Sequence, residues 1–497
     1  MASLLQDLQL KLQDPSIPWD KVLLGSIGTV ALFEEWLGSR QRPYLSSLLH
    51  PQLPSALRPY LTAPDTAQTY SKSQAYARSK LNYSLAATVI DLVESFVLLT
   101  PVALPLWTAA GLPYTGSERW TLLRGLWDLS GQLPGARKGE ISHSMAFVAL
   151  MTAVGAVLSI PKDLYKNFVL EQKHGFNKMT LSTFWKDQVK GLAISLALEV
   201  PLIGGLIKII HWAGQDAILR IVAWTILFIF CIQLIMVPLY PAVIQPLFNT
   251  FTPLPDDSPV RPRVKALAEK LNFPLGKIWV INGSLRSSHS NAYFYGLPGL
   301  HKNIVIYDTL IDKSSPEEVE AILAHELGHW YHGDIAYLLV TALLQLAFSL
   351  TIYSIFLTNG PLLRAFGFSP SSPLLSKLAH PTSSTSTSHG PTIIALLLAS
   401  LLAAPLSAFL KFATNTVTRA LEYRADAFAV RCGGETAKNL KGALVGIHEK
   451  NLAVYGVDPI YSAYNHNHPT LLERLEALDK GIAKLGGGAE REGKKEK

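Results

Sequence analysis

Residues 321–350 read "AILAHELGHWYHGDIAYLLVTALLQLAFSL" and join two different patterns. In the first, His325 and His329 are four apart on a predicted helix, so both imidazoles lie on one face and can bind one metal ion. In the second, residues 335–357 contain no charged side chain and reach the ~20 residues that cross a bilayer as a helix. The stretch therefore predicts a metal site at the edge of a membrane.

Charged residues are scarce in the rest of the chain, and the apolar residues are clustered. Asp, Glu, Lys and Arg make up 16% of the 497 residues, against about 25% in soluble proteins. Runs long enough to span a bilayer cover 85–110, 141–160, 192–212, 221–243, 335–357 and 392–412, and a shorter run covers 22–36. We expect an α-helical polytopic membrane protein with about seven transmembrane helices.

Ionisable side chains interrupt several of these runs, namely Glu34, Glu35, Asp91, Glu94, Glu199 and Lys208. Each costs about 2.5–3.5 kcal/mol or more at the centre of a bilayer unless it is paired or hydrated. A position near a helix end, where the side chain reaches the interface, is the ordinary alternative. We expect instead that the helices enclose a hydrated chamber, in which a water-dependent site can lie against lipid.

The runs divide the chain into four parts. Residues 1–244 hold five spans, and 245–334 hold the metal helix after short β-rich runs such as "KIWVINGS" and "NIVIYDTLI". Residues 335–412 hold two spans around a Ser/Thr/Pro-rich loop, and 413–497 form a soluble C-terminal part. We expect the loop and the tail "GGGAEREGKKEK" to be disordered.

The distribution of positive charge predicts the orientation in the membrane. Two spans separate the soluble stretches, so both stretches lie on one side. When seven spans are counted, the loops 38–84 and 161–191 also lie on that side, and both are rich in Lys and Arg. The loop 111–140 is the exception, because it is basic but lies on the opposite side. The positive-inside rule places the metal site and the C-terminus in the cytosol. The net charge of +7 then reflects topology rather than nucleic-acid binding.

The "HELGH" segment predicts hydrolytic chemistry. Glu326 stands beside the two histidines, where its carboxylate can take a proton from a water molecule. Zinc suits such a site because it lowers the pKa of bound water to about 7. We expect one zinc ion per chain, with His325 and His329 as ligands and Glu326 as the general base.

A third protein ligand is needed, and the sequence offers two candidates. His332 lies on the same helix, three residues after His329, where ligation would strain the geometry. Glu422 and Asp426 are four apart in "TRALEYRADAFAV" and share one helix face. We expect Glu422 to bind the metal and Asp426 to hydrogen-bond His325 and fix its tautomer. The alternative is a solvated helix face paired with nearby arginines.

The chain resembles the type I CAAX prenyl proteases, zinc endopeptidases that process the yeast a-factor precursor and prelamin A. The motifs that carry the resemblance are "KSQAYARSKLNY" (72–83), "EQKHGFNKMTLSTFWKDQVKG" (171–191), "GSLRSSHSNAYFYG" (283–296), "HELGHW", "LEYRADAFAV" and "YSAYNHNHPTLLERL" (461–475). Two positions depart from the family pattern. They are Asn282, where the family has Asp, and the second Asn of "YNHNHP", where the family has an aromatic residue. The resemblance implies a cytosolic α+β gluzincin-type zinc protease domain.

The resemblance also implies a substrate and two further site residues. The substrate is a membrane-associated protein or peptide that ends in a prenylated Cys and three more residues, and the enzyme releases that tripeptide. A second cut near the N-terminus of a pheromone precursor belongs to the same family. Asn291 would bind the substrate backbone and His468 would stabilise the oxyanion. The ordinary alternatives are a strand start for Asn291 and a helix cap for His468.

Other classes of membrane protein remain as alternatives. A heat-shock membrane protease of the HtpX type also joins a zinc helix to spans, whereas an intramembrane site-2-type protease would place that helix within a span. A transporter-like protein without catalysis would explain the spans alone. The terminal pattern Lys494-Lys495-Glu496-Lys497 predicts retrieval to the endoplasmic reticulum, and we expect that membrane, extending to the inner nuclear membrane, as the location. The oligomeric state stays open.

Overall fold

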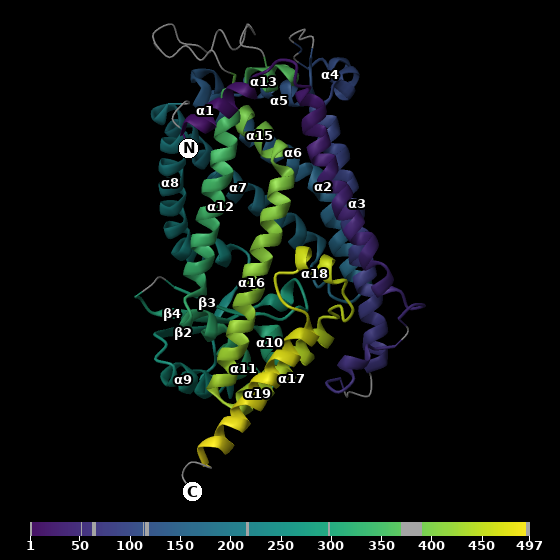
Figure 1. Ribbon diagram of the computed structural model, residues 1–497, viewed down its shortest axis with the longest axis vertical. Coiled ribbons are helices and arrows are strands. Elements are labelled where there is room, and N and C mark those ends of the chain that lie inside the picture. The colour runs from purple at the N-terminus through teal and green to yellow at the C-terminus, as the bar shows by residue number, and fades with distance from the viewer. Residues whose placement is uncertain are drawn as a thin grey trace.

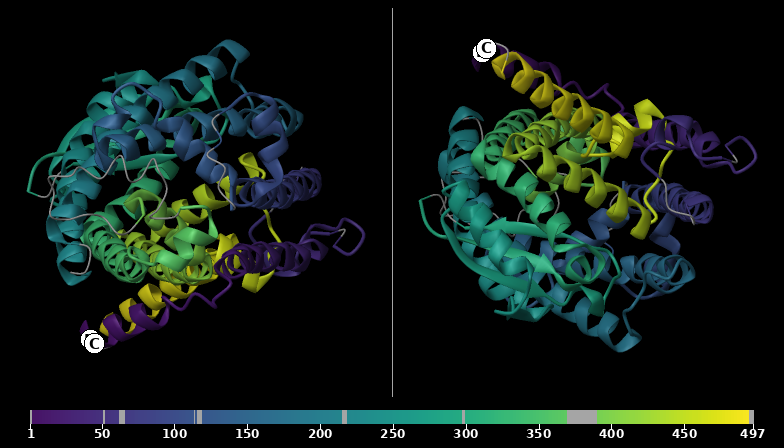
Figure 2. Two further views of the ribbon diagram at one scale, coloured as in Figure 1. Left: turned by 90° about the horizontal axis from the view of Figure 1, so that it is seen from above. Right: turned by 90° about the horizontal axis from the view of Figure 1, so that it is seen from below.

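Long apolar helices run along the longest axis of the computed structural model, which describes residues 2–50, 52–61, 66–112, 114, 119–214, 218–296, 299–368 and 390–493 (Figure 1). Five of them are long and apolar enough to cross a membrane, or six when a bent pair counts as one span. They are α3 (Thr66–Leu99), α6 with η5 (Glu140–Glu171), α7 (Leu181–Ala213), α8 with η6 and η7 (Ile218–Leu247), α12 (Asp334–Phe356), and the pair α15 (Thr392–Leu402) and α16 (Ala404–Cys432). Figure 2 looks along the same axis from both ends. The predicted polytopic helical fold is confirmed.

Two of the expected spans end or break at prolines. The run 85–110 belongs to α3, which begins at Thr66 and ends at Leu99, because the backbone of Thr100 is extended before Pro101. The run 392–412 bends by 63° between α15 and α16, where Ala403 separates the helices and α16 has a proline in its first turn. Beyond the bend, α16 continues as one helix to Cys432.

The seventh candidate span, 22–36, lies inside α2 (Trp19–Gln41). This helix has 23 residues, enough for a bilayer, and lies beside α3 in Figure 1. It is not among the helices apolar enough to count as spans, since it carries Asp20, Lys21, Glu34 and Glu35. The described residues therefore contain up to six spans by length and composition, and α2 accounts for the difference from seven.

Most of the ionisable groups inside the spans have partners. Lys162 of α6 binds Asp91 at 2.8 Å and Glu94 at 3.3 Å, so one ammonium group pairs with both carboxylates of α3. Glu199 of α7 accepts a hydrogen bond from Thr152 at 2.8 Å. Asp91 nevertheless keeps 62% of its side chain exposed. These groups are paired across helices without being buried by the protein.

Short helices close the end of the molecule opposite the C-terminus (Figure 1). They are α1 (Ala2–Lys11), η3 (Pro101–Ala103), α4 (Leu104–Ala109), α5 (Leu122–Ser130), η4 (Ala136–Lys138) and α13 (Gly360–Ala365). Their core surrounds Trp127, which is buried. Arg124 and Asp128 form a buried ion pair at 2.9 Å, and Arg124 also donates to the carbonyl of Gly367 at 2.8 Å. A buried pair with such additional hydrogen bonds is compensated for its lost hydration.

A small sheet with its helices lies at the other end, in agreement with the predicted α+β part (Figure 1). Its elements are β1 (Phe251–Pro253), α9 (Val260–Lys270), β2 (Leu275–Ile281), η8 (Gly283–Leu285), β3 (Ala292–Tyr295), β4 (Lys302–Tyr307), α10 (Asp308–Lys313) and α11 (Pro316–Tyr331). The strand order is β1-β2-β4-β3, with β2 and β4 parallel and the outer pairs antiparallel. Strand β3 is therefore an edge, and β4 is paired on both sides.

The C-terminal part packs against this unit. It consists of α17 (Gly434–Lys450), α18 (Pro459–Asn465) and α19 (Leu471–Gly493), while η1 (Pro43–Leu45) and η2 (Ser55–Leu57) link α2 to α3. The expectation of a disordered tail is wrong for residues 486–493, because α19 continues through them. The Ser/Thr/Pro-rich loop, for the most part, and the terminal lysine pattern lie outside the described residues.

Candidate metal centre

Helix α11 carries the two predicted histidines, and its sequence fixes where it begins. The Ser315 hydroxyl oxygen accepts a hydrogen bond from the backbone N–H of Glu318, and the Glu318 carboxylate accepts one from the backbone N–H of Ser315. This capping box satisfies free N–H groups of the first turn. Gly333, in the left-handed conformation (φ 68°), separates α11 from α12. The metal helix and the membrane helix are therefore distinct, which disfavours a site-2-type arrangement.

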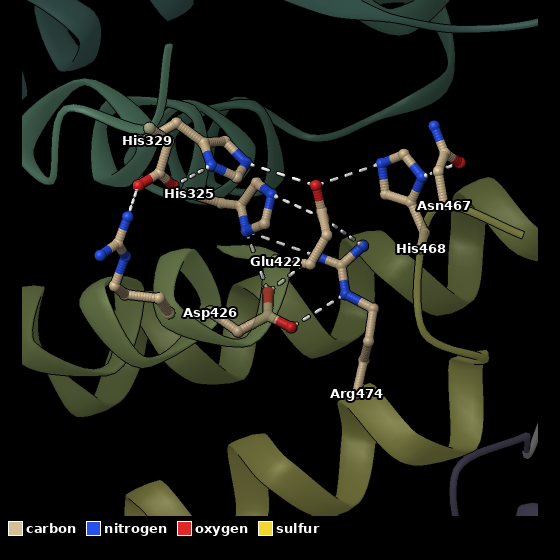
Figure 3. Close-up of polar contacts among 9 residues, drawn as sticks. His325, His329, Glu422, Asp426, Asn467, His468 and Arg474 are labelled. Carbon is tan, nitrogen blue, oxygen red and sulfur yellow. Dashed lines mark hydrogen bonds and ion pairs between the residues drawn. The ribbon is translucent and has the colours of Figure 1, made fainter. Parts of the chain in front are cut away.

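Helix α16 brings Glu422 to the two histidines (Figure 3). Its carboxylate oxygens lie 3.4 Å from Nε2 of His325 and 3.5 Å from Nε2 of His329. One donor atom from each of the three residues lies within 4.8 Å of the other two. Gly328 permits this approach: a Cβ there would be 3.1 Å from the Cβ of Phe428 on α16.

Each histidine is oriented by a carboxylate that is held by an arginine. Nδ1 of His325 lies 2.9 Å from Asp426, the contact predicted from the sequence. Arg474 of α19 binds both oxygens of Asp426, at 2.7 and 2.9 Å. Hydrogen bonds of this kind fix the tautomer and the ring orientation of a ligand histidine.

A second carboxylate–arginine pair, which the sequence did not predict, orients His329. Nδ1 of this ring lies 2.7 Å from Asp334, the first residue of α12, and Arg424 of α16 binds the same carboxylate. Only the position of Asp334 directly after the Gly333 break pointed to it. Arg424 and Arg474 gave no signal, because a single arginine in a helix is usually a surface residue.

Burial controls the protonation of the groups on α11. It raises the pKa of Glu326 above the ordinary value, while the neighbouring histidines act in the opposite direction. For His325, burial acts to lower the pKa, but the hydrogen bonds to Asp426 and Glu422 prevail and raise it to about 9. A proton on His325 therefore competes with a metal ion for the same ring.

The remaining predicted residues lie at different positions around the cluster. Nε2 of His468 lies 3.3 Å from Glu422, and its Nδ1 lies 2.7 Å from Asn467. Asn291 directly precedes β3, and its side chain accepts a hydrogen bond from the backbone N–H of Ala292, so this residue lies at the start of the strand. His332 ends α11 and faces Arg431 at 3.4 Å, outside the cluster.

The donor set fits a zinc ion. Two imidazole Nε2 atoms and one carboxylate leave a position open, as in catalytic zinc sites with three protein ligands. Oε2 of Glu422 is buried, and its nearest polar neighbours, Nε2 of His325 at 3.4 Å and Arg474 at 3.8 Å, do not form a well-aligned hydrogen bond with it, which suits an atom that binds a cation. A cavity of about 240 Å³ opens beside it, between Glu326 and His329 on one side and Tyr293 and Phe294 of β3 on the other.

Two family models match consecutive parts of the chain. Residues 45–250 match the model described as CAAX prenyl protease N-terminal, five membrane helices, and 256–482 match Peptidase family M48. Together with the site, they define a polytopic membrane metallopeptidase that depends on zinc. Similarity over nearly the whole chain then identifies the family more narrowly.

The chain belongs to the CAAX prenyl protease 1 family. It is 32% identical to CAAX prenyl protease 1 of Saccharomyces cerevisiae, over 95% of this chain and 98% of that protein. The Arabidopsis thaliana homolog is 34% identical, with coverage of 93% and 98%. The crystal structure of S. mikatae Ste24p is 31% identical and superposes with a TM-score of 0.80, over 93% of this chain and all of that one.

Metal content tests the ligand set. Glu422→Ala removes the carboxylate between the two rings, so the purified variant is expected to lose zinc. Glu326→Gln changes a neighbouring residue of the same chemical type that is not a ligand, and it is expected to retain one zinc per chain. Inductively coupled plasma mass spectrometry after gel filtration measures both. Stoichiometric zinc in Glu422→Ala would exclude this ligand set.

The Asp334–Arg424 pair that orients His329 leads to a separate prediction. Asp334→Asn removes the charge that orients His329, so zinc affinity is expected to fall by about 10–100-fold, as measured by competition with a chromophoric chelator. Asp312→Asn, an exposed aspartate on α10, serves as the control and should leave the affinity unchanged. Equal affinities for the two variants would mean that Asp334 does not support the metal.

Proposed function

We propose that this protein removes the C-terminal tripeptide from prenylated CAAX proteins, with His325, His329 and Glu422 as zinc ligands. The observation that carries the proposal is the cluster of these residues with Glu326 beside a cavity, at the junction of a membrane helix and a soluble domain. Relatives named CAAX prenyl protease support the substrate class. A second cut, near the N-terminus of a pheromone-type precursor, belongs to the same proposal.

In the reaction, Glu326 acts on the attacking water. Zinc, when bound, supplies Lewis acidity and lowers the pKa of water to about 7. The Glu326 carboxylate accepts a proton from this water as it attacks the scissile carbonyl, and then gives the proton to the leaving amine. His468, on the side of Glu422 away from α11 (Figure 3), donates a hydrogen bond to the oxyanion of the tetrahedral intermediate.

The substrate binds as an extra strand on β3. The β-rich run "NIVIYDTLI" before the metal helix cannot take the substrate, because its strand, β4, is already paired on both sides. In the part of the chain that the structure describes, no strand pairs with the other side of β3, and Tyr293 and Phe294 of this strand line the cavity beside Glu326. Peptide addition to a free edge provides main-chain hydrogen bonds, and Asn291, just before this strand, adds one from its side-chain amide.

A hydrated chamber lets the lipidated substrate reach the site. Polar groups of neighbouring helices face one another within the spans: Lys162 of α6 pairs with Asp91 and Glu94 of α3, and Glu199 of α7 accepts from Thr152 of α6. Ionisable groups within spans are costly unless they are paired or hydrated, and their clustering between helices supports water there. The prenyl chain then stays in or beside the bilayer while the peptide approaches the metal centre from within.

Location and orientation complete the proposal. The active site and the C-terminus face the cytosol, as the positive charge of the loops indicates. The membranes that hold the protein are the endoplasmic reticulum membrane and the inner nuclear membrane. A heat-shock protease of the HtpX type is disfavoured, because the chain also matches the CAAX-specific N-terminal model over 45–250.

Cleavage of a defined peptide tests the activity. Purified protein is expected to release the tripeptide from a farnesylated CAAX peptide, and a zinc chelator should abolish release until zinc is restored. Glu326→Gln should lower the rate by more than about 100-fold, because it removes the general base. Mass spectrometry of the products locates the cut. Equal turnover of a non-prenylated peptide, or full activity of Glu326→Gln, would contradict the proposal.

Thiol accessibility tests the chamber. Cysteines that replace Asp91, Glu94 and Glu199 are expected to react with a small water-soluble maleimide in the membrane-bound protein. Val93 is the matched control: it lies two residues from Asp91, on the opposite face of α3, and is 55% exposed as a lipid-facing residue would be. A cysteine at Val93 should stay unmodified. Equal protection at all four positions would indicate a dry bundle.

A further inference from the structure

The segment that carries His468 has few direct restraints of its own. The side chain of His468 is 54% exposed, and its polar contacts among the described residues are with Asn467 and Glu422. The segment 466–470 therefore depends on its two ends. One end is α18, and the other is Thr470, whose backbone N–H donates to Glu473 at 2.7 Å.

Helix α18 is too short to hold itself in place. It has seven residues, and helices of this length are not stable without tertiary contacts. On one side, α16 holds it: Asn415 donates to the carbonyl of Tyr464 at 2.7 Å, and Arg419 donates to Ser462 at 3.0 Å. Because α16 also carries Glu422, these contacts set α18 relative to the metal centre.

On the other side, α2 holds α18. Arg40 binds both oxygens of Asp458, at 2.8 and 3.2 Å, although they are 418 residues apart in the sequence. Gln41 accepts from the backbone of Asp458 at 2.8 Å and donates to the carbonyl of Gly456 at 3.1 Å. Tyr464 donates to Glu34, also on α2, at 3.2 Å.

Asp458 is the point where these contacts meet. It is buried, with 3% of its side chain exposed, and its Oδ1 also accepts from the backbones of Ile460 and Tyr461 at 3.0 Å, which caps α18. A bidentate arginine–carboxylate pair constrains direction as well as distance. Arg40 therefore fixes the start of the helix whose end leads into His468.

We propose that α2 positions His468 through the Arg40–Asp458 ion pair, and that Arg40 is a positioning residue for peptide hydrolysis. The inference rests on the proposed function, because it assumes that His468 acts in the reaction. Helix α2 ends before residue 45, where the first family match begins, and it is not one of the apolar spanning helices. The polar side chains of α2 that contact α18 therefore support the active site, a role that membrane insertion alone does not require.

A double-mutant cycle tests the coupling. The full chain is purified as wild type, Arg40→Gln, His468→Ala and the double variant, and kcat, KM and zinc content are measured with a farnesylated CAAX peptide. Arg40→Gln should lower kcat by about tenfold, since small misplacements of a reacting group are costly, with KM and zinc unchanged. In the His468→Ala background, Arg40→Gln should cost less than about twofold, because residues that act as a unit are not additive.

Two further variants separate positioning from folding. Asp458→Asn keeps an oxygen for capping α18 but loses the charge, so it should reproduce the effect of Arg40→Gln. Arg42→Gln, an exposed neighbour on the same segment, should keep the wild-type kcat.

The outcomes distinguish this inference from the proposed function. The inference is contradicted, and the proposed function is unaffected, if His468→Ala lowers kcat while Arg40→Gln has the wild-type kcat. The same holds if the fold-losses in kcat of the two single variants multiply in the double variant. If Arg40→Gln loses zinc or changes only KM, the inference also falls. Full activity of His468→Ala would overturn both the role of His468 and the inference.

Discussion

The carboxylate of Glu422 between two imidazole rings is the interaction on which the rest of the structure depends. It requires α11 and α16 to lie nearly in contact, and Gly328 permits this because a larger residue would meet Phe428. It also gathers several carboxylates in a mostly buried place, which is unfavourable unless each is paired. Arg474 and Arg424 compensate Asp426 and Asp334, and these two carboxylates orient the histidines. Metal ligation, the packing of α11 against α16 and the compensation of the buried charges therefore depend on the same residues.

The same constraint explains why the site lies at a membrane. Helix α16 begins at the bend after α15 and continues without a break to Glu422 and Asp426, so the span and the ligand share one rigid element. Helix α12 begins with Asp334, which holds His329. The first residue of a membrane helix is thereby a part of the metal centre. The site cannot move away from the membrane edge without losing a ligand or a ligand's support.

The sequence predicted what depends on local spacing. His325, Glu326 and His329 are fixed relative to one another by a single helix, and so are Glu422 and Asp426, so the i and i+4 positions identified them. Asp334, Arg424 and Arg474 were missed because their roles depend on contacts between helices that no spacing encodes. The end of α3 before Pro101 and a break near Pro405 in the first turn of α16 could have been read from the prolines, whereas the 63° angle of that bend could not. The helical tail to Gly493 extends a helix whose earlier turns pack against α16 and α17, beyond what its glycine-rich composition would predict.

X-ray absorption at the zinc edge of the purified full chain tests the central claim most directly. The arrangement of His325, His329 and Glu422 predicts two imidazole nitrogens and oxygen ligands at about 2.0–2.2 Å, without sulfur. It also predicts that the Glu422→Ala spectrum, for any zinc retained, lacks one oxygen while both imidazoles remain. Sulfur scattering at about 2.3 Å, or a wild-type spectrum that Glu422→Ala leaves unchanged, would contradict the account.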